Sequence, residues 1–255
     1  MPAASPYRLG VANHPPIFYL MRIIFHQGRM PVKSPLVVFD LDGTLIDTAP
    51  DLIASLNHTI AALDLAPVGY GDLTHLVGQG ARAMIERACA LRGHQVSDDA
   101  LPPLMERFIA FYTDTMPGDS KPYPGLLASM DALKAAGFGL AVCTNKMESL
   151  ALTLLNRLDL TERFNAITGG DSFPVRKPHA EHLIGTVSRA GGELTRTVMV
   201  GDSVNDVLVA RNAGVPSIAV PFGYSDVGIE TLNPSHIIAH FDELTPALVE
   251  SLLVG

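Results

Sequence analysis

Apolar residues along the chain follow two patterns, one typical of buried strands and one typical of amphipathic helices. The run from Leu36 to Phe39 is apolar without alternation, which predicts a strand buried on both faces of a parallel sheet. Similar short runs predict further strands at 138–143, 166–168, 197–200, 217–220 and 236–238. Spacing typical of helices occurs at 50–63, 81–91, 99–115, 126–136, 148–158, 180–189 and in a segment ending near Gly214.

The order of these elements predicts the fold class. From residue 123 onward strands and helices alternate with short links, which is typical of an α/β protein with a doubly wound parallel sheet. Residues 48–122 show only helical patterns. We therefore expect a core formed by 33–47 and 123–255, with 48–122 inserted as a helical cap domain. Residues 1–32 are expected to be a disordered or loosely packed extension.

Composition narrows the range of partners. Hydrophobic residues make up 47% of the 255 residues and charged residues 17%, which is typical of a globular protein. The net charge of −8 argues against a nucleic-acid partner, because a phosphate backbone requires a basic surface. The apolar segment 17–25 is too short to span a membrane and contains Arg22. The two cysteines, Cys89 and Cys143, are expected to be buried and reduced, which favours a cytoplasmic location. The protein is further expected to be a monomer or homodimer, with no membrane partner.

Two carboxylates stand where the first strand ends. Asp40 and Asp42 lie one residue apart, and Gly43 follows them. Unpaired carboxylates are costly at the end of a buried strand. The carboxyl edge of an open α/β sheet, however, is where such folds bind ligands. Two carboxylates at that edge can hold a hard divalent cation while one of them attacks an electrophile.

Polar residues also follow the later strands. Thr144 ends the second strand, Lys177 lies in the loop after the third, and Asp202 and Asp206 follow the fourth. Each residue alone is ordinary, since a strand-end threonine, a surface lysine and a helix-capping aspartate are common. Parallel strands point their carboxyl ends the same way, however, so these groups can converge on one crevice. An acid pair, a hydroxyl, a cation and a second acid pair suit phosphoryl transfer.

These motifs resemble a known family. DLDGTLID from Asp40, the strand ending in Thr144, the Lys177-Pro178 pair and GDSVND from Gly201 resemble the four signature motifs of the haloacid dehalogenase superfamily, in its phosphatase branch. The helical segment 48–122 is similar to the first type of cap domain in that family. The resemblance implies a phosphatase with this α/β core and a bound Mg²⁺.

The resemblance also implies a role for each motif residue. Asp40 is expected to attack phosphorus and form an aspartyl-phosphate, and Asp42 to act as the general acid and base. The phosphoryl oxygens are expected to be bound by Thr144, Asn145 and Lys177. The Mg²⁺ ligands implied are Asp40, the main-chain carbonyl of Asp42 and Asp202, with Asp206 orienting the metal's waters or Lys177.

Within the superfamily the segments DGTLIDTAPDL, VGQGA, YPG and TNK are most similar to phosphoglycolate phosphatases. The resemblance therefore implies a small phosphorylated substrate, 2-phosphoglycolate. Its carboxylate is expected to contact the cap at Gly78, Gly80 and Arg82, because glycines allow backbone amides to approach an anion closely. A pyrophosphatase or a sugar-phosphate phosphatase with the same core stays open as an alternative.

Other activities fit the sequence less well. A β-phosphoglucomutase-type mutase is disfavoured because Thr44 and Leu52 depart from the pattern of that branch. Haloacid dehalogenase activity is rejected because Asp42 is present. A non-catalytic binding module would be expected to lack Asp40, Asp42 or Lys177, and none is lost. A dinucleotide enzyme would carry a GxGxxG motif after its first strand, and this chain does not.

Overall fold

The computed structural model describes residues 33–72, 80–225 and 227–254. Within this part of the chain six strands form one parallel sheet in the order β5-β4-β1-β6-β7-β8. The strands are β1 (Leu36–Phe39), β4 (Gly139–Cys143), β5 (Ala166–Thr168), β6 (Thr197–Gly201), β7 (Ser217–Ala219) and β8 (His236–Ile237). The predicted doubly wound parallel sheet is thereby confirmed.

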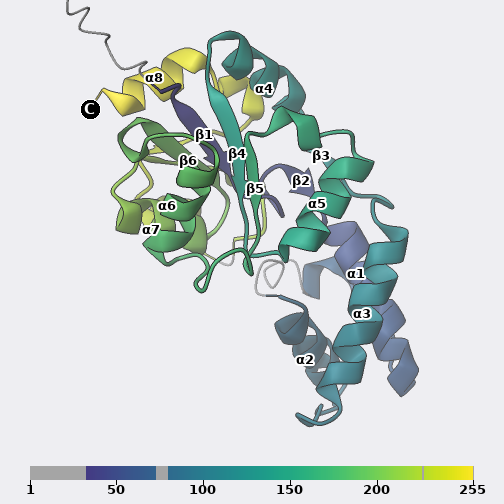
Figure 1. Cartoon of the computed structure of the whole chain (residues 1–255). Helices are drawn as coiled ribbons and strands as arrows, with labels where there is room; N and C mark the ends of the chain where they lie inside the picture. The colour runs from purple at the N-terminus through teal and green to yellow at the C-terminus, as the bar shows by residue number, and fades with distance from the viewer. Residues whose placement is uncertain (1–32, 73–79, 226, 255) are drawn as a thin grey trace, which may run out of the picture. The chain divides into compact units, whose positions relative to one another are not determined.

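Helices cover both faces of this sheet (Figure 1). They are α4 (Leu126–Ala135), α5 (Glu148–Arg157), α6 (Ala180–Arg189), α7 (Val204–Ala213) and α8 (Pro246–Leu253). Alternate residues of β1 face opposite layers, as the two-residue period of a strand requires. Val37 and Phe39 belong to the cluster that includes residues of α4, α5 and α8, whereas Leu36 and Val38 belong to the cluster with α6 and α7. This burial on both faces explains why the sequence of β1 is continuously apolar.

Three helices form a separate group between β1 and α4. They are α1 (Ala49–Ile60), α2 (Ala81–Leu91) and α3 (Leu101–Thr115), and they pack against one another. Figure 1 shows them beyond the ends of the sheet strands, away from the layer of α6 and α7. α1 gives way to a 3-10 turn at Ala61–Leu63, so the predicted helix 50–63 is only partly α-helical. The cap domain is thus a three-helix group in the described residues.

Among the strands and α-helices of the described residues, the sequence patterns missed one pair of short strands and one helix. A two-stranded antiparallel ribbon joins β2 (Ile46–Asp47) to β3 (Lys121–Pro122), at the two places where the chain passes between the core and the helical group. Helix α8 near the carboxyl terminus was also not predicted. Apart from the helix predicted at 50–63, the predicted strands and helices appear with ends shifted by two residues at most.

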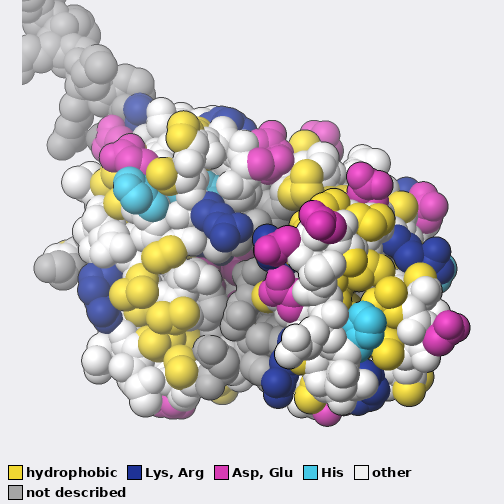
Figure 2. Space-filling model, turned by 90° about the horizontal axis from the view of Figure 1, so that it is seen from below, with side chains coloured by type: hydrophobic (Ala, Val, Ile, Leu, Met, Phe, Trp, Pro, Cys, Tyr) yellow, Lys and Arg dark blue, Asp and Glu magenta, His cyan; other side chains and the backbone are white. Residues whose placement is uncertain are grey.

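The cysteines, the hydropathy of the helices and the surface charge can also be described. Cys89 and Cys143 are buried and free, as expected. None of the described helices is long and apolar enough to cross a membrane. On the face shown in Figure 2 the Lys and Arg side chains lie in separate small groups with acidic side chains between them. That face therefore lacks the continuous basic stripe that a nucleic-acid backbone requires.

Candidate active site

The site begins in the turn that follows β1. Asp40 is buried, and its Oδ1 accepts a hydrogen bond from the Leu41 amide at 2.7 Å. Gly43 has φ +81°, and a Cβ there would lie 2.5 Å from Oδ2 of Asp202. Glycine is therefore required for both the left-handed turn and the close approach of Asp202. The turn holds the carboxylates of the first motif against the later strands.

The sheet register brings the other motifs to the same edge. Phe39 pairs with Val142 of β4 on one side and with Val200 of β6 on the other. Thr144 and Asp202, which follow β4 and β6, therefore reach the same edge as the end of β1. Thr144 is buried, and its Oγ1 accepts a hydrogen bond from the Lys146 amide at 3.2 Å.

Lys177 is buried between two acids. Its Nζ lies 2.8 Å from Oδ1 of Asp40 and 2.7 Å from Oδ1 of Asp206. Burial lowers the pKa of Lys177, but the charges of Asp206 and Asp40 outweigh it, so that the pKa is raised above its ordinary value. The backbone around it is held by two side chains, because the Lys177 amide donates to Nδ1 of His182 and its carbonyl accepts from Asn145. Lys177 therefore stays protonated beside Asp40.

The second acid pair is held as firmly. Asp202 accepts hydrogen bonds at 2.7 Å from the Thr44 hydroxyl and from the Tyr224 amide. Asp206 lies in the first turn of α7, where its Oδ2 accepts from the amide and hydroxyl of Ser203 in a capping box. With Oδ1 on Lys177 and Oδ2 on Ser203, both oxygens of Asp206 are engaged. This geometry suits the orienting role expected for Asp206.

The carboxylates form a group that fits a divalent metal ion. Oxygen atoms of Asp40, Asp202 and Asp206 lie within 4.8 Å of one another. Burial, together with the charges of Asp206 and Asp40, raises the pKa of Asp202 to about 8. The pKa of Asp40 is raised to about 6, chiefly by burial, although Lys177 opposes the shift. The three carboxylates of Asp40, Asp202 and Asp206 share one ammonium, that of Lys177. Such an excess of acidic oxygen donors suits a hard cation such as Mg²⁺.

Asp42 has a partner that the sequence analysis missed. Lys146 Nζ lies 3.0 Å from Oδ1 and 3.3 Å from Oδ2 of Asp42, while the Thr48 hydroxyl donates to the same Oδ1 at 2.7 Å. The Lys146 ammonium also lies 4.5 Å from the centre of the Tyr112 ring, which belongs to α3. Burial lowers the pKa of Lys146, but the Asp42 charge and Tyr112 outweigh it and the pKa is raised. In the sequence, Lys146 is marked by its place two residues after Thr144, as the last residue of the TNK segment.

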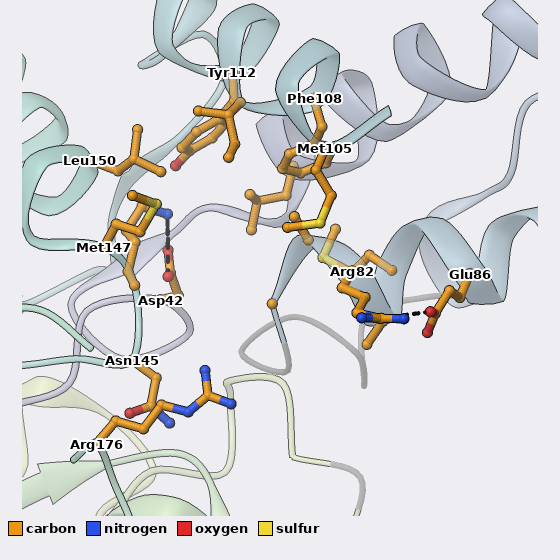
Figure 3. Close-up of a pocket in the computed structure, with 17 residues that line it drawn as sticks. Asp42, Arg82, Glu86, Met105, Phe108, Tyr112, Asn145, Met147, Leu150 and Arg176 are labelled. Atoms are coloured by element: carbon orange, nitrogen blue, oxygen red, sulfur yellow. Dashed lines mark hydrogen bonds and ion pairs between the residues drawn. The ribbon is translucent and has the colours of Figure 1, made fainter. Parts of the chain in front are cut away.

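A cavity of about 460 Å³ opens beside Asp42 (Figure 3). One wall comes from α2 and α3 of the helical group, and the other from the turn after β1, the segment after β4 and Arg176. Most of the lining is apolar, with Met105, Phe108 and Tyr112 from α3. A small ligand in this cavity would be enclosed between the helical group and the core.

The residues expected on the cap side have different positions. Gly78 lies outside the described residues. Gly80 lines the cavity, with φ +95° at the start of α2. The Arg82 guanidinium donates to Glu86 at 2.9 Å and to Asp98 at 2.7 Å, and Figure 3 shows it directed toward Glu86. Arg82 therefore borders the cavity with its charge already engaged.

Comparisons with known proteins identify the family. The family model described as haloacid dehalogenase-like hydrolase matches residues 37–220. A protein of Agrobacterium fabrum named phosphoglycolate phosphatase is 60% identical over 220 residues, which are 86% of this chain and 94% of that protein. A protein of the same name from Mesorhizobium japonicum is 47% identical over 222 residues, 87% of this chain and 98% of that protein.

Solved structures share the fold. A crystal structure from Haemophilus somnus, described as a predicted phosphoglycolate phosphatase, has a TM-score of 0.77 at 29% identity and covers 83% of this chain and 96% of its own. CbbY from Rhodobacter sphaeroides, solved with phosphate, has a TM-score of 0.71 at 22% identity, covers 85% of this chain and 99% of its own, and supports the fold alone. The expected fold and the expected enzyme class, a phosphatase, are thus confirmed. The chain belongs to the haloacid dehalogenase-like hydrolase family.

Proposed function

We propose that this chain is a Mg²⁺-dependent phosphatase that hydrolyses 2-phosphoglycolate to glycolate and phosphate. The observation that carries the proposal is the buried Lys177 ammonium, 2.8 Å from Asp40 Oδ1, at the sheet edge that Thr144 and Asp202 also reach. A cation beside a carboxylate nucleophile lets a phosphoryl dianion approach an acid that would otherwise repel it. The substrate is proposed from relatives of that name, 60% and 47% identical.

The first chemical step is transfer of the phosphoryl group to the protein. An Asp40 oxygen attacks phosphorus, a new phosphorus–oxygen bond forms, and the bond from phosphorus to the ester oxygen breaks. Asp42, protonated at that moment, gives its proton to the departing oxygen, so that glycolate leaves with a neutral hydroxyl. Thr144, Asn145 and Lys177 donate hydrogen bonds to the non-bridging oxygens during this step.

The second step returns the enzyme to its starting state. Asp42, now ionised, takes a proton from a water molecule as that water attacks the phosphorus of the Asp40 aspartyl-phosphate. The acyl-phosphate bond breaks, inorganic phosphate leaves, and Asp42 again carries the proton that the next cycle needs. The Asp42 carboxyl group thus serves as a general acid in the first step and as a general base in the second.

The proposed metal ligands are Asp40, the main-chain carbonyl of Asp42 and Asp202. A bound Mg²⁺ would neutralise charge on the transferring phosphoryl group. Asp206 is proposed to keep Lys177 in place through the 2.7 Å contact to its ammonium. The roles of all these residues follow from the family resemblance and are supported by their grouping.

The helical group is proposed to act as the cap. Core 33–47 and 123–255 and cap 48–122 enclose the 460 Å³ cavity, and such enclosure keeps water away from the reacting groups. Gly78, Gly80 and Arg82 stay predictions as substrate contacts, and Arg82 would have to leave Glu86 and Asp98 to reach a substrate. A cytoplasmic location and a monomeric or homodimeric state also stay predictions.

A substrate panel tests the proposal. Phosphate release is measured from 2-phosphoglycolate, pyrophosphate and several hexose phosphates, each with Mg²⁺ and with EDTA. We expect the highest kcat/KM on 2-phosphoglycolate and loss of turnover in EDTA. A preference for pyrophosphate or a hexose phosphate would replace the proposed substrate by one of the alternatives. Absence of phosphate release from every compound would overturn the function itself.

A further inference from the structure

The described residues place three cationic side chains along the cavity, and they differ in burial and in partners. Arg82 is 56% exposed at its side chain and donates to Glu86 and Asp98. Arg176 is exposed and comes from the loop between β5 and α6. Lys146 is only 5% exposed at its side chain, and its ammonium lies on the Asp42 carboxylate. Of the three, Lys146 is the one that already binds a carboxylate in a buried place.

The contact between Lys146 and Asp42 would keep Asp42 from its proposed role in catalysis. In the proposed reaction Asp42 must reach the ester oxygen of the substrate and give it a proton. In the structure both Asp42 oxygens lie within 3.3 Å of the Lys146 ammonium, and Thr48 donates to one of them. The Lys146 ion pair and the Thr48 hydrogen bond together hold this carboxylate in one position, away from a substrate. Productive chemistry therefore needs another group to take the place of Asp42 on Lys146.

The substrate carries such a group. In 2-phosphoglycolate one methylene separates the ester oxygen from the carboxylate. When the Asp42 side chain contacts the ester oxygen, the carboxylate of the substrate is therefore close to that side chain. The Lys146 ammonium lies in the same place. An exchange of one carboxylate for another keeps Lys146 paired, so no buried charge is left without a partner.

We propose that Lys146 binds the carboxylate of the substrate in exchange for Asp42, and that this exchange frees Asp42 to act on the ester oxygen. The proposal rests on the proposed function and deepens it, because it names the residue that selects acidic phosphomonoesters. A phosphomonoester with a neutral end leaves Asp42 on Lys146 and is hydrolysed slowly. Specificity thus arises in the core, two residues after the phosphate-binding Thr144.

Tyr112 gives the cap a part in this exchange. The Lys146 ammonium lies 4.5 Å from the centre of the Tyr112 ring, within the range of a cation–π contact. Tyr112 belongs to α3 and is 1% exposed, so its ring is fixed by the packing of the helical group. The ring face keeps the ammonium at the cavity while its carboxylate partner changes. Helix α3 of the helical group therefore supplies one side of the Lys146 site.

The test compares two small substrates that differ in charge at one end. Lys146→Met removes the ammonium and keeps the length of the side chain, while Lys134→Met makes the same change at an exposed lysine of α4. We expect Lys146→Met to lower kcat/KM on 2-phosphoglycolate by about tenfold or more. On ethyl phosphate, which has a methyl group in place of the carboxylate, the change should stay within about threefold or be a gain. Lys134→Met should leave both substrates unaffected.

Two further measurements separate binding from folding. Lys146→Arg keeps the charge and should keep the preference for 2-phosphoglycolate over ethyl phosphate. In an Asp40→Asn background, expected to be unable to turn over, calorimetric titration with 2-phosphoglycolate should give a weaker Kd when Lys146→Met is added. Far-ultraviolet circular dichroism and the melting temperature of Lys146→Met, compared with those of the wild type and of Lys134→Met, show whether the variant has folded.

Three outcomes would overturn the proposal. The first is an equal loss of kcat/KM on both substrates in Lys146→Met. The second is a wild-type enzyme whose kcat/KM on ethyl phosphate equals its kcat/KM on 2-phosphoglycolate. The third is a selective loss on 2-phosphoglycolate in Arg82→Ala or Arg176→Ala while Lys146→Met keeps the preference. All three differ from failure of the proposed function, in which wild-type enzyme releases phosphate from no phosphomonoester.

Discussion

The Lys177 ammonium lies 2.8 Å from Oδ1 of Asp40, so that the proposed nucleophile is paired with a buried cation before any substrate arrives. This pair joins the end of β1 to the loop between β5 and α6. Asp206 is a second partner of the same ammonium, at 2.7 Å, and so helps to hold it in place. The Asp40–Lys177 pair thus places the proposed attacking oxygen directly beside a positive charge that can bind the phosphoryl group.

The first prediction concerns Asp40. Asp40→Asn should lower phosphate release to the background of the uncatalysed reaction, because an amide is a very poor nucleophile. The amide oxygen can still accept a hydrogen bond from Lys177, so the melting temperature should stay close to that of the wild type. Asp159→Asn is a matched control, since Asp159 is exposed and has φ 56°, a conformation that asparagine tolerates. Near-native turnover in a pure Asp40→Asn preparation would remove the proposed mechanism.

The second prediction concerns the metal ion and pH. The pKa of Asp202 is raised to about 8 without metal, so the folded protein holds a proton that the unfolded chain has already lost. The metal-free fold should therefore lose stability as pH rises from about 4 toward 8. Mg²⁺ competes with that proton, and its stabilising effect should be larger at pH 8.5 than at pH 6.

Melting temperatures in EDTA and in Mg²⁺ measure this effect. The increase caused by Mg²⁺ should grow with pH in the wild type and shrink at every pH in Asp202→Asn. EDTA should also stop turnover, and added Mg²⁺ should restore it. A Mg²⁺ effect that is independent of both pH and Asp202 would contradict the proposed ligand set.

The third prediction concerns acid stability. His182 is fully buried in α6, and its Nδ1 accepts the Lys177 amide at 3.0 Å. Burial and the nearby Lys177 charge lower the pKa of His182 to about 4. Below pH 6.5 the unfolded chain binds a proton that the native protein does not, so stability is lost as pH falls from 6.5 toward 4.

His182→Asn tests this effect, because the asparagine oxygen can accept the same amide without titrating. The stability advantage of the wild type over His182→Asn should be larger at pH 7 than at pH 5, as measured by urea unfolding at each pH. Parallel pH curves for the two proteins would show that His182 makes no such contribution.

Much of the core could be predicted because burial on both faces leaves a clear trace in the sequence. β1 is a continuous apolar run, and β5 and β6 are short, mostly apolar and fully buried. In a parallel sheet their carboxyl ends then meet at one edge. This is why Asp40, Lys177 and Asp202 could be assigned to one crevice before their distances were known. The assignment needed topology alone and no side-chain detail.

The missed features depend on contacts between distant segments. The ribbon of β2 and β3 has two residues in each strand and includes Pro122, so it is too short to show a period. The position of Lys146 is decided by Asp42 and by Tyr112 of α3, and neither partner is indicated by the residues around Lys146. Arg82 was the nearest cation to a glycine loop in sequence, but Glu86 and Asp98 occupy its guanidinium. Side-chain partners of this kind follow from packing rather than from local pattern.

The last prediction concerns the junction between core and cap, where Asp51 is buried. Asp51 lies in the first turn of α1, where the chain enters the helical group. Its carboxylate accepts hydrogen bonds from the amides of Gly118, Asp119 and Ser120, at 2.9, 2.8 and 3.3 Å, in the segment that returns to β3. The Ser120 hydroxyl donates to it as well. One side chain therefore ties together the two connections between core and cap.

Asp51→Asn should weaken this junction. The asparagine NH₂ group cannot accept the hydrogen bonds that backbone N–H groups now donate to one of the carboxylate oxygens. Its own N–H groups would instead face those donors. We expect the free energy of unfolding to fall by about 1–3 kcal/mol, the usual cost of leaving buried polar groups unpaired. The KM for 2-phosphoglycolate should rise because the cap side of the cavity is less well positioned. Asp119→Asn is the matched control, since the Asp119 side chain is exposed in the same segment. Urea unfolding and steady-state kinetics measure the free energy of unfolding and the KM of both variants. Equal values for Asp51→Asn and Asp119→Asn would show that the Asp51 carboxylate does not hold the junction.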